Sequence, residues 1–491
     1  MSAPLVDRKV EVRELRRLAR SNAPELALLT GRRRLGKTYL LTHAWESERL
    51  FLYTASRTTA AINRRQLLND FSAWAETDIR PEDHPTWRSV FNVLLAVAGP
   101  LRDKSPVVIV LDEFQYLADA PDDAGMLASE LNAAWESRQG TPPILLVLAG
   151  SSVGTMEALA GGGGALYGRF SWHHELRPFG YVNAAEMAPF PDLRDRALAY
   201  GVFGGTPRYL AALREDETFA SNVITLMIRP GGEIRQSVET ALDQEDGLRN
   251  VSKYRAIVHA IANGRTERNE IAQMVGLKND TGLIHKLNGL IDLGYIEIRR
   301  NIDARPRDPI RYAVSDPAFR FHQQFVEPAA SIIERYGPEK AWETAIAGRI
   351  DAYMGLAFED MARQAYDHLA ERLGLPLVRT WGRWEGTDRA GRSLEIDLLA
   401  ELVDGRMLSG AVKWNREPVS GKLHWDHMDM LQRAAHAGRK WAHRALEPGA
   451  VVVYVAAGGF APDFSAALIG GHTTGAEPQI VRFGLEEMYG G

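Results

Sequence analysis

Short apolar runs alternate with amphipathic segments along the first third of the chain. Four such runs lie at residues 26–30, 50–55, 107–113 and 144–150. Continuous apolar runs of this length are typical of strands that are buried on both faces. The segments between them, such as residues 64–75, space their apolar residues with helical periodicity. This alternation predicts an α/β fold with a doubly wound parallel sheet.

The remaining pattern divides the chain further. A mainly helical stretch ends in the acidic sequence DQEDG, three helical patterns and two strands follow, and strands return near the C-terminus. We therefore expect four parts: an α/β domain at 1–175, a helical lid at 176–250, a three-helix unit with a hairpin at 251–326, and a second α/β domain at 345–491.

Composition narrows the class of protein. With 45% hydrophobic and 25% charged residues, the 491-residue chain is typical of globular proteins, and its net charge of -5 gives no overall attraction to nucleic acid. The chain has no cysteine, which excludes disulfides, a thiol nucleophile and cysteine-built zinc sites. The charged N-terminal segment lacks a signal-peptide core, and the apolar runs are too short to span a membrane. We expect a cytoplasmic protein with no membrane partner.

The sequence GRRRLGKT at residues 31–38 fits the P-loop pattern, with an apolar run before it and a helical pattern after it. Glycines let the backbone wrap around a phosphate, so that its N–H groups point inward. Lys37 would reach the β- and γ-phosphates, and the hydroxyl of Thr38 would bind Mg²⁺. The expected nucleotide contacts are Gly31, Arg34, Leu35, Gly36, Lys37, Thr38 and Tyr39.

A second motif supports ATP and Mg²⁺ as cofactors. In VLDEFQYL, an apolar strand ends in Asp112 and Glu113. Asp112 would hold the magnesium through its water shell, and Glu113 would activate the attacking water. The motif therefore predicts hydrolysis in addition to nucleotide binding.

Two further positions are open to alternative interpretations. In LAGSS, Ser151 or Ser152 would lie beside the γ-phosphate and sense its loss, or would be a solvated serine at a strand end. Arg169, which follows a run of four glycines, is a candidate arginine finger acting in cis or from a neighbouring subunit. It is equally compatible with a surface arginine.

These motifs together resemble a known family. VDRKVEVREL, GRRRLGKT, VLDEFQYL, LAGSS, YGRF and FGGTPRYL occur in the order seen in archaeal-type ATPases of the STAND/AAA-like class. The resemblance implies that Arg8 lies near the nucleotide base. It also implies that the turn at Pro207 packs near the adenine and couples nucleotide state to the lid. Such proteins can assemble on activation, so a homo-oligomer is one open possibility.

Residues 251–326 resemble the winged-helix segment of the same family. The third helix carries few positive side chains, chiefly His285 and Lys286. Arginines gather instead on the expected wing, where they suit phosphate contacts rather than base reading: Arg299, Arg300, Arg305, Arg307 and Arg311. Contact with DNA and a role in protein packing remain alternatives.

The C-terminal part resembles a PD-(D/E)xK nuclease core, that is, a restriction-endonuclease-like α/β domain. Glu359 lies on a helix, Asp397 on a strand and Lys413 on the next strand. Asp397 and Glu359 would hold Mg²⁺, and Lys413 would stabilise charge on a phosphate. The acid that the pattern places two residues before the lysine is here Ala411, so Glu395 is a candidate substitute. Cleavage and a degenerate nucleic-acid-binding or structural role both remain open.

A third group, HWDHMD at residues 424–429, has the residue types of a metal site. We expect it to form a polar, solvated helix face instead.

The main hypothesis is therefore a Mg²⁺-dependent, ATP-hydrolysing switch protein acting on or near DNA. One alternative is an ATP-gated DNA nuclease. Another is a nucleotide-responsive DNA-binding regulator without cleavage.

Overall fold

The computed structural model describes residues 5–101, 105–120, 123, 125–137, 143–245, 248, 250–305, 308, 310–469 and 478–490. The chain forms two compact units, residues 1–178 and residues 179–491.

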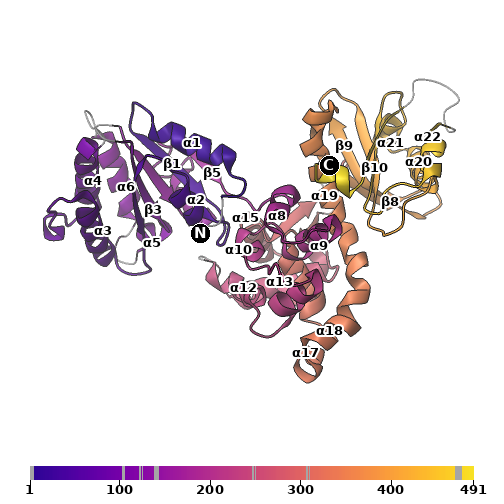
Figure 1. Ribbon diagram of the computed structural model, residues 1–491, viewed down its shortest axis with the longest axis horizontal. Helices are drawn as coiled ribbons and strands as arrows, with labels where there is room; N and C mark the ends of the chain where they lie inside the picture. The colour runs from indigo at the N-terminus through magenta and orange to yellow at the C-terminus, as the bar shows by residue number, and fades with distance from the viewer. Residues whose placement is uncertain are drawn as a thin grey trace. The chain divides into compact units, whose positions relative to one another are not determined.

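The first unit, coloured indigo to purple in Figure 1, is built on a five-stranded sheet. The strand order is β2-β3-β4-β1-β5. Its strands are β1 (Glu25–Thr30), β2 (Arg49–Thr54), β3 (Val107–Asp112), β4 (Leu145–Ala149) and β5 (Trp172–Glu175). All neighbouring pairs are parallel. The predicted α/β class and its four apolar strands are confirmed. The strand β5 was missed because its sequence, WHHE, alternates between exposed and half-buried residues and has no apolar run.

Helices cover both faces of this sheet. Helices α1 (Lys9–Ala19) and α2 (Lys37–His43) share one apolar core with the sheet, and α3 (Ala60–Ala75), α4 (Trp87–Leu101) and α6 (Met126–Glu136) share the other. Shorter helices are η1 (Pro81–Asp83), α5 (Gln115–Ala118) and α7 (Val153–Ala160). Every residue of β3 is buried, as expected for a strand between two helical layers.

The second unit begins with helices, most of which pack around one continuous core. They are α8 (Tyr181–Met187), α9 (Leu193–Phe203), α10 (Pro207–Leu210), α11 (Phe219–Val223), η2 (Ile224–Ile228), α12 (Glu233–Ala241) and η3 (Leu242–Gln244). Next come α13 (Val251–Ala262), α14 (Arg268–Val275) and α15 (Thr281–Asp292), followed by the antiparallel hairpin of β6 (Ile296–Arg299) and β7 (Arg311–Val314). The three helices and two strands that the pattern predicts here are present.

Further helices lead to the C-terminal sheet: α16 (Pro317–Phe321), η4 (His322–Val326), α17 (Ala330–Tyr336), α18 (Pro338–Ala341), η5 (Trp342–Ile346), η6 (Ala347–Arg349) and α19 (Ile350–Leu373). The sheet has the order β12-β11-β10-β9-β8. Its strands are β8 (Val378–Thr387), β9 (Ser393–Leu402), β10 (Met407–Lys413), β11 (Val451–Ala456) and β12 (Gln479–Phe483).

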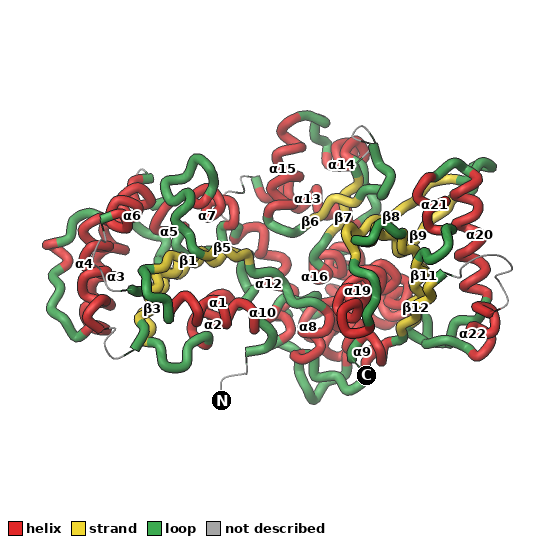
Figure 2. Tube along the Cα trace, turned by 90° about the horizontal axis from the view of Figure 1, so that it is seen from above, coloured by secondary structure: helices red, strands yellow, loops and turns green. Residues whose placement is uncertain are grey.

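This second sheet is mixed: β8, β9 and β10 pair antiparallel, whereas β10, β11 and β12 pair parallel. Helix α19 covers one face, and α20 (Lys422–His436) and α21 (Lys440–Ala445) cover the other (Figure 2). Helices α22 (Pro462–Ile469) and α23 (Leu485–Met488) complete the unit. In the part of the chain that the structure describes, no helix combines the length and apolarity needed to cross a membrane.

Candidate functional site

The loop between β1 and α2 is shaped by two glycines with positive φ angles. Gly31 has φ 141°, and a Cβ there would lie 2.6 Å from the carbonyl oxygen of Leu176. Gly36 has φ 83° and directly precedes the first turn of α2. Residues other than glycine rarely adopt these φ angles. The conformation of this loop therefore requires glycine at both positions.

The ammonium of Lys37 lies against the backbone of the same loop. Its Nζ donates hydrogen bonds to the carbonyl oxygens of Gly31 at 2.7 Å and Arg32 at 3.1 Å. Lys37 is 6% exposed. A buried positive charge held over a glycine-bounded loop is suited to receive an anionic group.

The two residues expected to hold magnesium meet directly. The hydroxyl of Thr38, in the first turn of α2, donates a 2.5 Å hydrogen bond to Oδ2 of Asp112 at the end of β3. Burial raises the pKa of Asp112, which is 1% exposed. A hydroxyl and a carboxylate oxygen are the hard ligands that Mg²⁺ prefers, so this pair fits the ion.

Glu113 is fixed by two neighbours. Its Oε2 accepts a 2.7 Å hydrogen bond from the hydroxyl of Ser151 and a second hydrogen bond from the side-chain amide of Gln115. The same amide donates to the hydroxyl of Ser151 at 3.0 Å. Glu113 has φ 52°, a left-handed conformation that is uncommon for non-glycine residues and is concentrated at functional sites.

The strand order explains this cluster. Because β4 lies between β1 and β3, Ser151, two residues after β4, lies beside the end of β3. Of the two serines left open by the sequence, it is Ser151 that contacts Glu113, whereas the hydroxyl of Ser152 donates to Thr155. Gln115 was missed by the sequence analysis. The sequence feature that could have identified Gln115 is its polar side chain just after the acidic pair. In the structure, Gln115 is 1% exposed.

The other residues expected near the nucleotide have protein partners. Arg169 pairs with Glu136 at 2.5 Å and donates to Asn132 at 3.0 Å, and both partners belong to α6. The buried guanidinium of Arg8 donates to the carbonyl oxygen of Arg177 at 2.7 Å, and burial lowers its pKa. The roles expected for Arg169 and Arg8 stay predictions.

The G-x-P turn lies in the second unit. Pro207 is the first residue of α10. Two residues before it, a Cβ on Gly205 would lie 1.9 Å from the carbonyl oxygen of Phe179, so only glycine fits there. The predicted contact of Pro207 with adenine stays a prediction.

In the second unit, the hairpin of β6 and β7, where the sequence predicts a wing, packs on β8 through the loop that joins its strands. The side chain of Asn301 donates to the backbone oxygen of Glu385 at 2.8 Å and accepts from its backbone N–H at 3.1 Å. Arg311 forms an ion pair with Glu385, and Arg299 lies 3.5 Å from Asp360. These wing arginines therefore have acidic partners within the unit.

Two other wing arginines, Arg300 and Arg305, are exposed. Arg307 lies outside the described residues.

The C-terminal acids form a loose group. Nζ of Lys413 lies 3.5 Å from Oδ2 of Asp397, and the same oxygen accepts from the backbone N–H of Val412 at 2.9 Å. Burial, together with the charge of Asp397, raises the pKa of Glu359 to about 7. Arg363 lies 3.6 Å from Glu359 and donates to the backbone oxygen of Asp397 at 3.1 Å.

Two observations limit this group as a metal site. Ala411 packs into the apolar core on the α20 side of the sheet and contributes no carboxylate. Glu395 instead pairs with Arg383 at 3.1 Å. Within the described ranges, no three histidine, aspartate or glutamate side chains are arranged to hold a metal ion.

The expectation of a solvated face at residues 424–429 was wrong for the two histidines. His424 and His427 are 0% and 1% exposed. His424 bonds the hydroxyl of Tyr454 at 2.8 Å, and His427 bonds that of Ser409 at 3.0 Å. The helical pattern did not show that this face of α20 packs on the second sheet.

Comparisons with known proteins agree with the first site. Residues 5–213 match a family model described as an ATPase domain predominantly from Archaea, and residues 322–424 match a model for archaeal and bacterial proteins of unknown function. An uncharacterized protein of Methanocaldococcus jannaschii is 26% identical over 415 residues, covering 83% of this chain and 87% of the relative.

Two solved structures are similar to part of this chain. A Walker-type ATPase of Pyrococcus abyssi shares 21% identity with a TM-score of 0.47, covering 65% of this chain and 96% of the other. The ORC2 protein of Aeropyrum pernix, in ADPNP–ADP complexes, shares 15% identity with a TM-score of 0.43, covering 67% and 94%. Residues 5–213 are therefore similar to ATPase domains found predominantly in Archaea.

Proposed function

We propose that the archaeal-type ATPase domain of this chain binds ATP with Mg²⁺ and hydrolyses it. One observation carries the proposal. Lys37 and the pairs Thr38–Asp112 and Glu113–Ser151 lie at the carboxyl ends of three neighbouring strands, β1, β3 and β4. Ligands of open α/β sheets bind at this edge.

Each residue of this site has a separate role in the proposed hydrolysis. The ammonium of Lys37 would balance the charge of the terminal phosphates, and the loop backbone would surround them. Mg²⁺, when bound through Thr38 and Asp112, would supply further neutralisation of phosphate charge. Both hydrogen bonds to Glu113 reach Oε2, so Oε1 is the oxygen available to take a proton from water.

A matrix of nucleotide and metal tests this proposal. Phosphate release should require ATP together with Mg²⁺ or Mn²⁺ and should stop when EDTA is added. Release that continues in EDTA would contradict the role of Thr38 and Asp112.

For the C-terminal sheet, we infer a nuclease-like fold that binds nucleic acid without cutting it. Lys413, Asp397 and Glu359 lie close enough to influence one another, as the nuclease pattern expects. The pattern also expects an acid at position 411, where this chain has Ala411. Two-metal cleavage needs converging carboxylates. Plasmid incubated with Mn²⁺ and ATP should remain uncut. Nicking that disappears in Asp397→Ala would instead establish the ATP-gated nuclease.

A role in binding DNA makes a separate prediction. The exposed Arg300 and Arg305 of the wing are the residues suited to phosphate contacts. Binding to duplex DNA should weaken as salt rises, because phosphate contacts release counterions. Binding that is insensitive to salt would contradict this role.

A further inference from the structure

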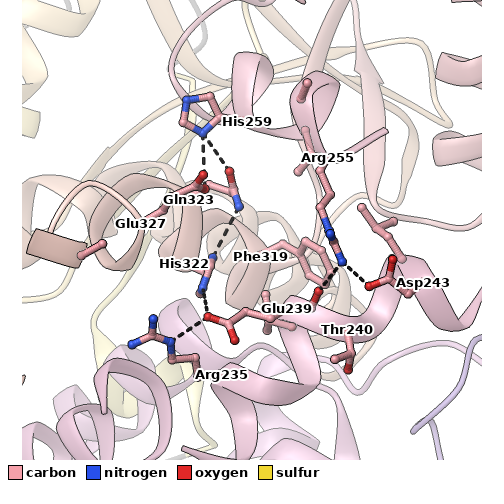
Figure 3. Close-up of a pocket in the computed structure, with 15 residues that line it drawn as sticks. Arg235, Glu239, Thr240, Asp243, Arg255, His259, Phe319, His322, Gln323 and Glu327 are labelled. Carbon is pink, nitrogen blue, oxygen red and sulfur yellow. Dashed lines mark hydrogen bonds and ion pairs between the residues drawn. The ribbon is translucent and has the colours of Figure 1, made fainter. Parts of the chain in front are cut away.

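A cavity of about 710 Å³ lies among the helices of the second unit (Figure 3). It is bounded by α12, η3, α13, α16 and η4. Its apolar wall includes Val238, Leu242, Val258 and Phe319. Cavities of roughly 300–1,000 Å³ with apolar walls and a few polar groups are typical of small-molecule sites.

The polar side of the cavity is a connected row of side chains. Oε1 of Gln323 accepts from Nδ1 of His259 at 3.0 Å, and Nε2 of Gln323 donates to Nδ1 of His322 at 3.4 Å. Because Nδ1 of His322 accepts this hydrogen bond, the proton of its neutral ring lies on Nε2. The amide of Gln323 thus fixes the tautomer of His322.

The Nε2–H of His322 is a buried donor whose nearest acceptor among the described residues, Oε1 of Glu239, lies at 3.5 Å, which is longer than a normal hydrogen bond. His322 is 7% exposed, and burial lowers its pKa, so the ring is neutral near pH 7. Leaving a buried donor without a good hydrogen bond carries a free-energy cost. A ligand that accepts this hydrogen bond would remove that cost.

A carboxylate stands beside this donor. Oε1 of Glu239 lies 3.5 Å from Nε2 of His322 and accepts a 2.8 Å hydrogen bond from Arg235. Although burial opposes it, this hydrogen bond and the charge of Arg235 lower the pKa of Glu239. The cavity therefore presents an N–H donor and an ionised acceptor side by side (Figure 3).

The cavity wall also contains a π-helical turn, one of three in the described part of this unit. Residues His322–Val326 form a π-helix, and the N–H of Glu327 donates to the carbonyl oxygen of His322 at 3.0 Å. His322, Gln323 and Glu327 all line the cavity. Turns of this kind are rare and are found frequently at functional sites.

We propose that this cavity binds a planar nitrogen heterocycle of the nucleobase class. An acceptor on the edge of the base would meet Nε2–H of His322, and an adjacent N–H donor would meet the carboxylate of Glu239. The ring of Phe319 and the apolar wall would cover the faces of the base.

Two other ligand types fit less well. An aliphatic ammonium would satisfy Glu239, but it would leave His322 unpaired and would be repelled by Arg235. A carboxylate would accept from His322 but would be repelled by Glu239. A neutral edge with an acceptor next to a donor meets both groups.

Calorimetric titration of the full chain with adenosine, guanosine, cytidine and uridine tests this proposal. Nucleosides carry no phosphate for the P-loop to hold, so the result does not depend on the ATPase site. We expect at least one to bind, and Glu239→Gln to weaken it by about 10-fold or more, a loss of about 1.4 kcal/mol. The matched control Glu334→Gln, at an exposed acid elsewhere in the unit, should leave binding unchanged.

Two further variants distinguish nucleoside binding in this cavity from binding at the ATPase site. Lys37→Ala should retain nucleoside binding in full, and His322→Phe should abolish it. Glu239 is partly exposed, so Glu239→Gln remains informative if His322→Phe does not fold. Failure of all four nucleosides to bind would overturn the proposal. So would binding that survives Glu239→Gln or disappears in Lys37→Ala.

Discussion

The hydroxyl of Ser151 donates a 2.7 Å hydrogen bond to Oε2 of Glu113, joining the ends of two adjacent strands. The carboxylate proposed to activate water is therefore held by a residue 38 positions further along the chain. Preorganised geometry of this kind contributes to rate because the catalytic group does not have to be positioned at each turnover.

Ser151→Ala should lower kcat for ATP hydrolysis while leaving KM nearly unchanged. The variant loses the hydrogen bond that positions Glu113, so we expect a loss of roughly 10-fold in kcat. Ser152→Ala is the matched control, because Ser152 bonds Thr155 instead. Steady-state phosphate release measures both. Equal losses in the two variants would count against a specific role for Ser151.

Lys37→Ala and Glu113→Gln should separate binding from chemistry. Without its ammonium, the loop should lose measurable affinity for ATP in a fluorescent-nucleotide assay. Glu113→Gln keeps the shape but removes the base, so affinity should remain while turnover falls by about 100-fold or more. Retained affinity in Lys37→Ala would contradict the assignment of the loop, and undiminished turnover in Glu113→Gln would contradict the role of the base.

Arg169 tests the arginine-finger hypothesis. Arginine fingers contribute about 10³–10⁵ in kcat, so Arg169→Ala should strongly reduce turnover if this arginine reaches the phosphates during the reaction. Glu136→Ala frees Arg169 from its 2.5 Å ion pair and should preserve or increase turnover. Unchanged kcat in Arg169→Ala would show that Arg169 is not an arginine finger and serves only in its contacts with α6.

Glu359 should make the stability of the second unit depend on pH. Its folded pKa of about 7 lies above the ordinary 4.5, so the folded state binds more protons between these values. The stabilisation from this group is fully present below pH 4.5 and is lost as pH rises through 7. Glu359→Gln should therefore be more stable than the parent at pH 8, by up to about 3 kcal/mol, and similar at pH 4.5.

Urea unfolding at the two pH values measures this difference. Millimolar Mn²⁺ at pH 8 provides a second arm, because an ion held by Glu359 and Asp397 would stabilise the parent and not the variant. If the parent and Glu359→Gln had the same urea midpoint at pH 8 as well as at pH 4.5, the proposed titration of Glu359 would be refuted.

Two variants of the predicted wing test its packing on β8 and its contact with DNA separately. Asn301→Ala removes two hydrogen bonds to Glu385 and should lower the unfolding free energy by about 1–3 kcal/mol. Arg300→Ala, at an exposed position, should leave stability unchanged and weaken DNA binding at low salt. DNA binding that is equal in Arg300→Ala and the parent would remove this arginine from the interface.

The sequence by itself determined the local elements and the chemistry carried by short motifs. Residue periodicity and turn requirements act over a few neighbouring residues. They account for the apolar strands β1 to β4, the glycine-bounded loop before Lys37 and the acidic pair after β3. The short strand β5 lacked an apolar run, so periodicity could not identify it.

Only the tertiary structure decided which distant groups meet. The position of β4 between β1 and β3 selected Ser151 over Ser152 and brought it to Glu113 and Gln115. Packing of α20 on its sheet buried His424, although its local sequence reads as a polar face. The cavity at His322 likewise needs helices that lie far apart along the chain. Such contacts depend on strand order and on packing between elements, which no local pattern of residues encodes.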